Sequence, residues 1–305
     1  MDWIREIKRR VYRTLNRRGL RLILAALATI YATVRARKLC RVSHEGNWVQ
    51  RFPCCTLVEL RPTLLTWKEI EESLRDLWMY QFLPSEGETV MDVGAGTGWE
   101  TLVFSRQVGK SGRVISIEAH PRVFSCLSKM CEENQLGNIT LIQAAIIDSE
   151  RGVLLTDFDE YIGNRIVKVD SGISVEGTTL DRIFESRQLS QIDLLKMNIE
   201  GAERYAIAGM REMVRRTRHV CISCHDFVAD KDGPEEMRTK AEVIAFLKQN
   251  GFDVFLRESD PRPEVRDYVY GLNRKLVTHD DRGAKLHGVA PSSLVSIERI
   301  VPLRE

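Results

Sequence analysis

Short apolar runs alternate with amphipathic segments between residues 89 and 272, and this pattern predicts a sheet of mostly parallel strands joined by helices. The predicted strands occupy residues 89–93, 113–118, 138–146, a run that starts at 192, then 220–227, 252–257 and 268–272. The predicted helices occupy residues 99–107, 121–136, a run that starts at 179, and 239–250. Strands that alternate with helices are typical of an α/β fold with a doubly wound sheet. We expect the last two strands to form an antiparallel pair that closes the sheet, and extra extended segments at 153–175.

The first 41 residues differ from the rest of the chain. Ile4, Ile7, Val11 and Leu15 recur at helical spacing among arginines, and residues 22–34 carry no charge. Thirteen residues are too few to cross a bilayer, which needs about 20. The pattern therefore predicts a basic helical extension over 1–41, and two interpretations stay open. The helix lies on an anionic membrane face, or it packs on the main domain with its charges in solvent.

Charge and cysteine content narrow the class of protein. Residues 1–41 hold twelve of the 45 Lys and Arg and two of the 43 Asp and Glu, so they carry +10; since the net charge of the whole chain is +2, the remainder carries −8. No aromatic-interleaved motif accompanies the arginines, so the sequence does not favour nucleic acid as a partner. Seven cysteines in 305 residues fit a reducing compartment, and we expect the spacing of Cys221 and Cys224 to reflect core packing rather than zinc. We expect a protein of the cytoplasm, either free or attached to the cytoplasmic face of a membrane.

The chain divides into four parts. After the extension, residues 42–84 contain three prolines and a helical run at 67–82, and we expect them to form a helical cap. Residues 85–275 form the main α/β domain. The tail at 276–305 is polar over most of its length and has no clear pattern.

The strongest chemical signal is the glycine-rich turn that follows the first strand of the sheet. Gly94, Gly96 and Gly98 permit close approach of a ligand to the backbone, and the helix behind them offers free N–H groups. A dinucleotide fingerprint would need glycine or alanine at 99, where this chain has Trp99. An NAD-linked oxidoreductase is therefore disfavoured.

The glycine spacing is instead similar to the one with which class I methyltransferases hold S-adenosylmethionine (SAM). Asp92 at the strand end is expected near the ammonium group of this ligand. Glu118 ends the next strand about twenty residues on, where a carboxylate can accept both ribose hydroxyls. Gln143 and Ala144, at the end of the third strand, are expected to line the adenine ring.

Four separated segments together resemble the FkbM family of SAM-dependent methyltransferases. They are Asp92 to Gly98, Glu118 with Pro121, residues 179–181, and the block from Lys196 to Glu203. The resemblance covers about residues 85–257, and that block is its most specific part. It implies O-methylation of a hydroxyl on a sugar, glycolipid or secondary metabolite, with a small molecule or glycan as acceptor. The chain departs from the family at Asn198, where Asp is usual, and at Thr97, where Asn is frequent. The first departure leaves a second interpretation open, a catalytically impaired protein that binds SAM as a scaffold.

Ligands of open α/β sheets bind outside the carboxyl ends of the strands. The catalytic candidates are therefore Asn198, Glu200, His225 and Asp226, with His225 as the natural base because it titrates nearest neutrality. Glu200, His225 and Asp226 could alternatively bind a divalent metal that lowers the pKa of the acceptor hydroxyl.

Three further polar residues are given structural roles. Glu203 and Asp181 are expected to cap helices, and Lys196 is expected to be a strand-edge cation paired with an acid.

Overall fold

The computed structural model describes residues 12, 14–17, 19–157, 165–167 and 172–276. A seven-stranded sheet forms its centre, in the order β13-β14-β12-β11-β4-β5-β6. β4, β5, β6, β11 and β12 are parallel to one another, and β14 is antiparallel to both β12 and β13. This topology confirms the predicted class I methyltransferase fold with its antiparallel closing strand. The strand bounds are β4 (Thr89–Val93), β5 (Arg113–Glu118), β6 (Ile139–Gln143), β11 (Ile192–Met197), β12 (Thr217–Ser223), β13 (Phe252–Leu256) and β14 (Tyr268–Asn273).

Helices cover both faces of the sheet because neighbouring residues of each buried strand point to opposite sides. In β4, Val90 belongs to the hydrophobic core on one face and Met91 to the core on the other. The first face is covered by α3 (Trp67–Trp78), α4 (Trp99–Val108) and α5 (Pro121–Glu133). The second is covered by α6 (Leu180–Ser186), α7 (Glu203–Ala208) and α9 (Lys240–Gln249). The short helices are α8 (Asp226–Ala229), α10 (Pro263–Arg266), η1 (Met213–Arg216) and η2 (Glu235–Met237).

A second, smaller sheet arises from the inserted segment between β6 and α6. Its order is β7-β10-β8-β9, with bounds β7 (Ala145–Ile146), β8 (Arg151–Leu155), β9 (Ile166–Val167) and β10 (Ile173–Thr178). The prediction of extended structure at 153–175 is confirmed for its described residues. The predicted strand at 138–146 is divided at Ala144, where the chain leaves the central sheet and enters the smaller one.

The prediction of a purely helical cap at 42–84 is wrong. α3 is present, but residues 41–59 form an antiparallel sheet of β1 (Arg41–Glu45), β2 (Asn47–Arg51) and β3 (Thr56–Glu59). Trp48, Val49 and Gln50 of β2 are all buried, so the alternation of polar and apolar residues that signals a half-buried strand is absent.

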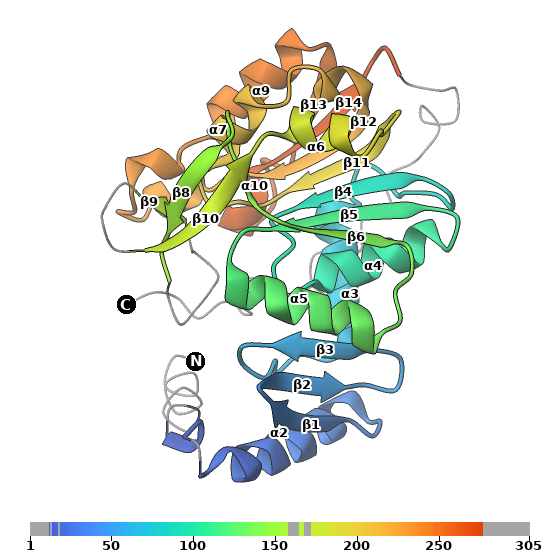
Figure 1. Cartoon of the computed structure of the whole chain (residues 1–305), viewed down its shortest axis with the longest axis vertical. Helices are drawn as coiled ribbons and strands as arrows, with labels where there is room; N and C mark the ends of the chain where they lie inside the picture. The colour runs from blue at the N-terminus through green and yellow to red at the C-terminus, as the bar shows by residue number, and fades with distance from the viewer. Residues whose placement is uncertain (1–11, 13, 18, 158–164, 168–171, 277–305) are drawn as a thin grey trace.

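The extension contains α2 (Arg21–Ala36), which lies along β1 at the end of the molecule opposite β13 and α9 (Figure 1). Leu24, Ala25 and Ala32 are buried on the side of α2 that faces the sheet of β1, β2 and β3, which we call the small N-terminal sheet. This face of the helix is therefore packed, but on the sheet of β1, β2 and β3, which lies outside the segment 85–275 on which one of the two interpretations placed it. No helix among the described residues is long and apolar enough to cross a membrane. The tail at 277–305 and residues 1–11 lie outside the described residues.

Candidate functional site

A cavity opens where β4, β5 and β11 end and the inserted sheet begins. Its polar lining comes from backbone at the glycine turn, from side chains at and after the ends of β5 and β11, and from Arg165. Its apolar lining comes from the strand ends and from the inserted segment. The lining residues are Val93, Gly94, Gly96, Ile117, Glu118, Ala119, His120, Ala144, Ala145, Ile146, Leu155, Arg165, Ile166, Asn198, Ile199, Glu200 and Ala202. Of the predicted site residues, the cavity brings together Gly94, Gly96, Glu118, Ala144, Asn198 and Glu200.

The glycine turn is shaped by backbone conformations that favour glycine. Gly94 and Gly98 have φ values of 72° and 98°. A Cβ at Gly94 would lie 1.9 Å from the backbone oxygen of Asn198, so the turn after β4 packs directly on the turn after β11. Gly98 does not line the cavity. A Cβ there would lie 2.3 Å from Cε of Met130, so this glycine serves the packing of α4 on α5.

Glu118 links the two strand ends. Its Oε2 accepts a hydrogen bond from the backbone N–H of Gly96 at 3.0 Å, and its Oε1 accepts one from the backbone N–H of His120 at 2.8 Å. Burial raises the pKa of Glu118 to about 7, although these two hydrogen bonds lower it. The carboxyl therefore lies against the glycine turn and lines the cavity.

Asp92 does not line the cavity. Its carboxylate is fully buried and lies 2.9 Å from Nζ of Lys196, and it accepts a hydrogen bond from Oγ1 of Thr101 at 2.7 Å. Lys196 also donates to the backbone oxygen of Gly94 at 2.7 Å. The ammonium group that Asp92 faces thus belongs to the chain itself.

Lys196 is paired with an acid, as expected, but it lies in the sheet interior rather than at an edge, since β11 lies between β4 and β12. Burial opposes its charge, yet Asp92 and Glu100 hold the pKa of Lys196 above its ordinary value.

Asn198 and Glu200 reach the cavity from the turn after β11. The Oδ1 atom of Asn198 is buried and has no hydrogen-bond partner among the described residues. Glu200 has a φ of 52°, in the left-handed region, and its carboxylate Oε1 lies 3.4 Å from Nε2 of His225. The strained backbone at Glu200 is compatible with a functional constraint on the direction of this side chain.

His225 is buried behind Glu200 and does not line the cavity. Its Nδ1 atom lies 3.3 Å from Oε1 of Glu203, so each ring nitrogen faces a carboxylate. Burial would lower the pKa of His225, but Glu200 and Glu203 outweigh burial and raise the pKa well above its ordinary value. An imidazole that already carries both protons at neutral pH cannot accept another, so the geometry disagrees with the prediction that His225 is the base.

Asp226 faces away from the other candidates. Its Oδ1 accepts hydrogen bonds from the backbone N–H groups of Thr239 and Lys240 at the start of α9. Asp226 therefore caps a helix, and it does not join Glu200 and His225 in the metal site that the sequence suggested. Across the described residues, no group of three or more His, Cys, Asp and Glu side chains is arranged to hold a metal ion.

The structural roles predicted for two acids agree with the structure. Glu203 lies in the first turn of α7 and accepts hydrogen bonds from the backbone of Ile199 and from Oγ1 of Thr239. Asp181 accepts backbone hydrogen bonds from residues 211–213, before and at the start of η1. Gln143 is exposed, whereas its neighbour Ala144 lines the cavity.

Sequence reasoning missed His120 and Arg165. His120 is buried, with Nε2 3.2 Å from Asp157, and its Nδ1 has no hydrogen-bond partner in the described part of the chain. Burial lowers the pKa of His120 although Asp157 raises it. Its place two residues after Glu118 was a usable signal. Arg165 lies in the inserted segment, where no pattern indicated it.

Glu59 was also missed, because it lies in a strand that was not predicted. This buried carboxyl of β3 accepts hydrogen bonds from Oγ1 of Thr97, at 2.8 Å, and from Nε1 of Trp99. It thereby ties the glycine turn and the start of α4 to the small N-terminal sheet. Burial raises the pKa of Glu59 to about 8, although these two hydrogen bonds lower it.

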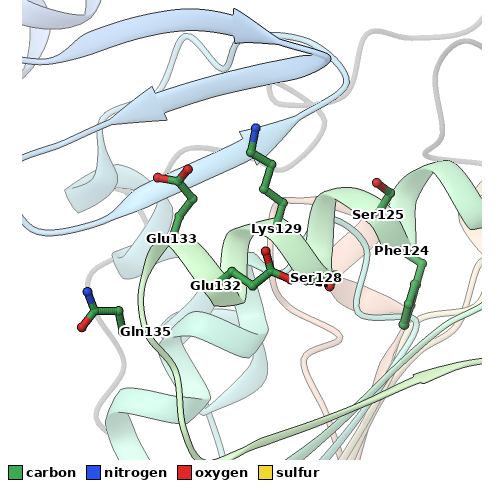
Figure 2. A pocket seen from close by; sticks show the side chains of 7 residues that line it. All are labelled: Phe124, Ser125, Ser128, Lys129, Glu132, Glu133 and Gln135. Atoms are coloured by element: carbon green, nitrogen blue, oxygen red, sulfur yellow. Dashed lines mark hydrogen bonds between the residues drawn. The ribbon is translucent and has the colours of Figure 1, made fainter.

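A second hollow lies over the outer side of α5 (Figure 2). It is lined by Phe124, Ser125, Ser128, Lys129, Glu132, Glu133 and Gln135. Lys129 forms an ion pair with Glu45, and Glu133 forms one with Arg51; both partners belong to the small N-terminal sheet. This hollow therefore marks the junction of α5 with β1 and β2. None of the predicted site residues lines it.

Comparisons with known proteins agree with the family resemblance of the four sequence segments. A family model described as the methyltransferase FkbM domain matches residues 92–254. A protein-L-isoaspartate O-methyltransferase of Methanococcus maripaludis is 37% identical over 57 residues, which are 19% of this chain and 27% of that protein. An enzyme of the same name from Thermosipho melanesiensis is 27% identical over 99 residues, 29% of this chain and 48% of that protein. The chain thus spans between about a quarter and a half of these relatives.

Solved structures give weaker likenesses. The crystal structure of methyltransferase FkbM from Methylobacillus flagellatus has a TM-score of 0.45 and 17% identity, and the match covers 66% of this chain and 47% of that one. Aeropyrum pernix fibrillarin, solved with natively bound SAM, has a TM-score of 0.41 and 14% identity, and the match covers 75% of this chain and 96% of the fibrillarin chain.

Proposed function

The chain belongs to the FkbM methyltransferase family, and we propose that it transfers a methyl group from SAM to a hydroxyl oxygen of a sugar, a glycolipid or another hydroxylated metabolite. One observation carries this proposal. The glycine turn, the Glu118 carboxyl and the polar residues after β11 meet around one cavity at the carboxyl edge of the sheet.

The residues around this cavity fit the methyl donor. Gly94 and Gly96 present backbone without side chains, and Glu118 is placed to accept hydrogen bonds from two ribose hydroxyls. His120 Nδ1 and Asn198 Oδ1 are buried polar atoms for which the described residues supply no hydrogen-bond partner. A ligand that satisfied them would remove an unfavourable desolvation.

The chemistry needs little beyond positioning and a proton acceptor. SAM, when bound, supplies an electrophilic methyl group, and the acceptor hydroxyl must lose its proton as the new bond forms. Glu200 is the carboxylate after β11 that lines the cavity, so we assign it as the acceptor of this proton. The charged ring of His225, 3.4 Å behind it, fixes the direction of the Glu200 carboxylate. Asn198 is placed to orient the acceptor by a hydrogen bond.

We also propose that the enzyme works in the cytoplasm. All seven cysteines are free, and six of them are buried in the core, including Cys221 and Cys224. A chain with this many unpaired thiols fits a reducing compartment.

Calorimetric titration of the full chain with S-adenosylhomocysteine tests the cofactor site. Because the ribose requires an ionised Glu118 and burial raises its pKa to about 7, we expect affinity to fall about tenfold per pH unit below pH 7. Glu118→Gln should bind at least tenfold more weakly at pH 8 and lose this pH dependence. Glu132→Gln, an exposed acid on α5, is the matched control. Absence of binding by the unmodified chain would refute the proposal.

The alternative of an impaired scaffold rests on Asn198, which lines the cavity where the family usually has Asp. Methyl incorporation from labelled SAM into an extract of sugars and polar lipids separates the two functions. Turnover by the unmodified chain excludes the scaffold. Turnover by Asn198→Asp alone would establish it.

A further inference from the structure

From Leu22 to Val34, α2 exposes a series of large apolar side chains. Five large apolar side chains of this helix are exposed, among them Leu22 at 85%, Ile30 at 62% and Val34 at 72%. We call these five residues, which are Leu22, Ile23, Leu27, Ile30 and Val34, the outer face of α2. No charged residue interrupts the helix between Arg21 and Arg35. A continuous apolar patch of this kind marks an interaction site rather than ordinary surface.

The opposite side of α2 is fixed to the body, so the helix cannot turn to bury its outer face. Thr29 Oγ1 accepts a hydrogen bond from the backbone N–H of Val42 at 2.9 Å, and Thr33 Oγ1 accepts one from Cys40 at 3.1 Å. The same hydroxyls donate to the carbonyl oxygens of these two residues at 3.3 and 3.1 Å. Two threonines one turn apart thus provide hydrogen-bond partners for backbone groups at the free edge of β1 and just before it, and the outer face of α2 points away from this strand.

Positive charge flanks both ends of the outer face. Arg17 precedes the helix, Arg37 and Lys38 follow it, Arg41 begins β1, and all four are exposed. The sequence from 7 to 44 contains no Asp or Glu. Two acids of the neighbouring elements are already paired, Glu69 with Arg35 and Glu45 with Arg51. The surface therefore presents an apolar stripe between basic ends.

We propose that the outer face of α2 lies in the interface of an anionic lipid bilayer, parallel to its plane. An apolar face between arginines and lysines suits lipid tails and acidic headgroups together. A second copy of the chain fits less well, because two such faces packed together would bring basic ends close to one another. The 16 residues of α2 are too few to cross the bilayer, which agrees with an orientation along the surface.

Flotation of the full chain with vesicles tests this inference. One set contains phosphatidylcholine alone, and the other contains phosphatidylcholine with about a third phosphatidylserine. We expect the chain to float with the anionic vesicles and, at equal lipid, at least tenfold less with the neutral ones. Ile30→Glu places a charge in the centre of the outer face and should reduce binding at least tenfold. Phe255→Glu, an equivalent change of an exposed residue on β13 at the other end of the molecule, should leave binding unchanged (Figure 1).

The basic ends give an independent variant. Replacing both Arg37 and Lys38 by glutamine should weaken binding to anionic vesicles about fivefold per residue and leave weak binding to neutral vesicles unchanged. Unaltered binding of S-adenosylhomocysteine shows that each variant is folded. Three results would overturn the inference: no flotation of the unmodified chain, equal flotation of Ile30→Glu, or a dimer in light scattering that Ile30→Glu converts to a monomer.

Discussion

Glu59 couples the stability of the fold to pH, and Glu59→Gln is the change that reveals it. The carboxyl is buried on β3, where it accepts hydrogen bonds from Thr97 and Trp99 and forms no ion pair with a described cation. The amide side chain introduced by Glu59→Gln would keep an accepting oxygen for both donors and carry no charge. It therefore imitates the protonated form of the native side chain.

The magnitude follows from the pKa of Glu59, which burial raises from its ordinary value of 4.5 to about 8. Because the folded chain holds this proton more tightly than the unfolded chain, the stabilisation is complete below pH 4.5 and is lost as pH rises through 8. Each pH unit within this window corresponds to about 1.4 kcal/mol, so the total from pH 4.5 to 8 is on the order of 5 kcal/mol. Glu118, whose pKa is raised to about 7, adds an effect of the same sign in both forms.

Urea unfolding of both forms between pH 5 and 9 isolates the contribution of Glu59, because all other groups titrate in both. We expect similar unfolding free energies near pH 5, an advantage of Glu59→Gln that increases up to about pH 8, and a constant difference from there to pH 9. Tryptophan fluorescence is a second measurement, since Trp99 donates to this carboxyl. Its titration near pH 8 should be present in the native chain alone. A difference in unfolding free energy that stays constant from pH 5 to 9 would refute the reasoning.

Three further changes test other parts of the site. Lys196→Met leaves the Asp92 carboxylate buried without its cation, so urea unfolding should show a loss of about 3–5 kcal/mol, much of it recovered when Asp92→Asn is added. Gly94→Ala places a Cβ 1.9 Å from a backbone oxygen and should abolish binding of S-adenosylhomocysteine in calorimetry. Gly137→Ala, where nothing lies within 4 Å, should change stability by less than about 0.5 kcal/mol. Glu200→Gln should bind S-adenosylhomocysteine normally but lower methyl incorporation about 10² to 10⁴-fold, and normal incorporation would exclude Glu200 as the base.

The central sheet could be predicted because its strands are short apolar runs bounded by turns, and its helices carry regular apolar spacing. The glycine turn and Glu118 could be predicted together because parallel strands place their carboxyl ends at one edge of the sheet. The small N-terminal sheet could not be predicted from the sequence. Trp48, Val49 and Gln50 are buried in succession in β2, which lies between β1 and β3, so their pattern depends on packing against other elements rather than on the strand's own sequence.

The directions of individual side chains at the strand ends could not be predicted from the sequence either. The position of Asp92 one strand residue before the turn predicted contact with a ligand, but the pleat directs this carboxylate into the core, where Lys196 of β11 meets it. His225 and Asp226 follow the end of β12, as expected for site residues, yet one is held between two glutamates and the other caps α9. Strand position predicts proximity to the site, whereas the partners of each side chain decide its chemistry.

The contacts of α2 also determine how its role can be tested. Thr29 and Thr33 satisfy backbone groups of β1, and β1 supports β2 and β3, which carries Glu59 against the glycine turn. Deleting residues 1–41 would therefore expose the edge of a sheet that anchors the cofactor turn, and a loss of membrane binding or of activity would follow from unfolding alone. A charge at Ile30 leaves every one of these hydrogen bonds in place. Point changes on the outer face of α2, rather than truncation, can therefore separate attachment to lipid from support of the fold.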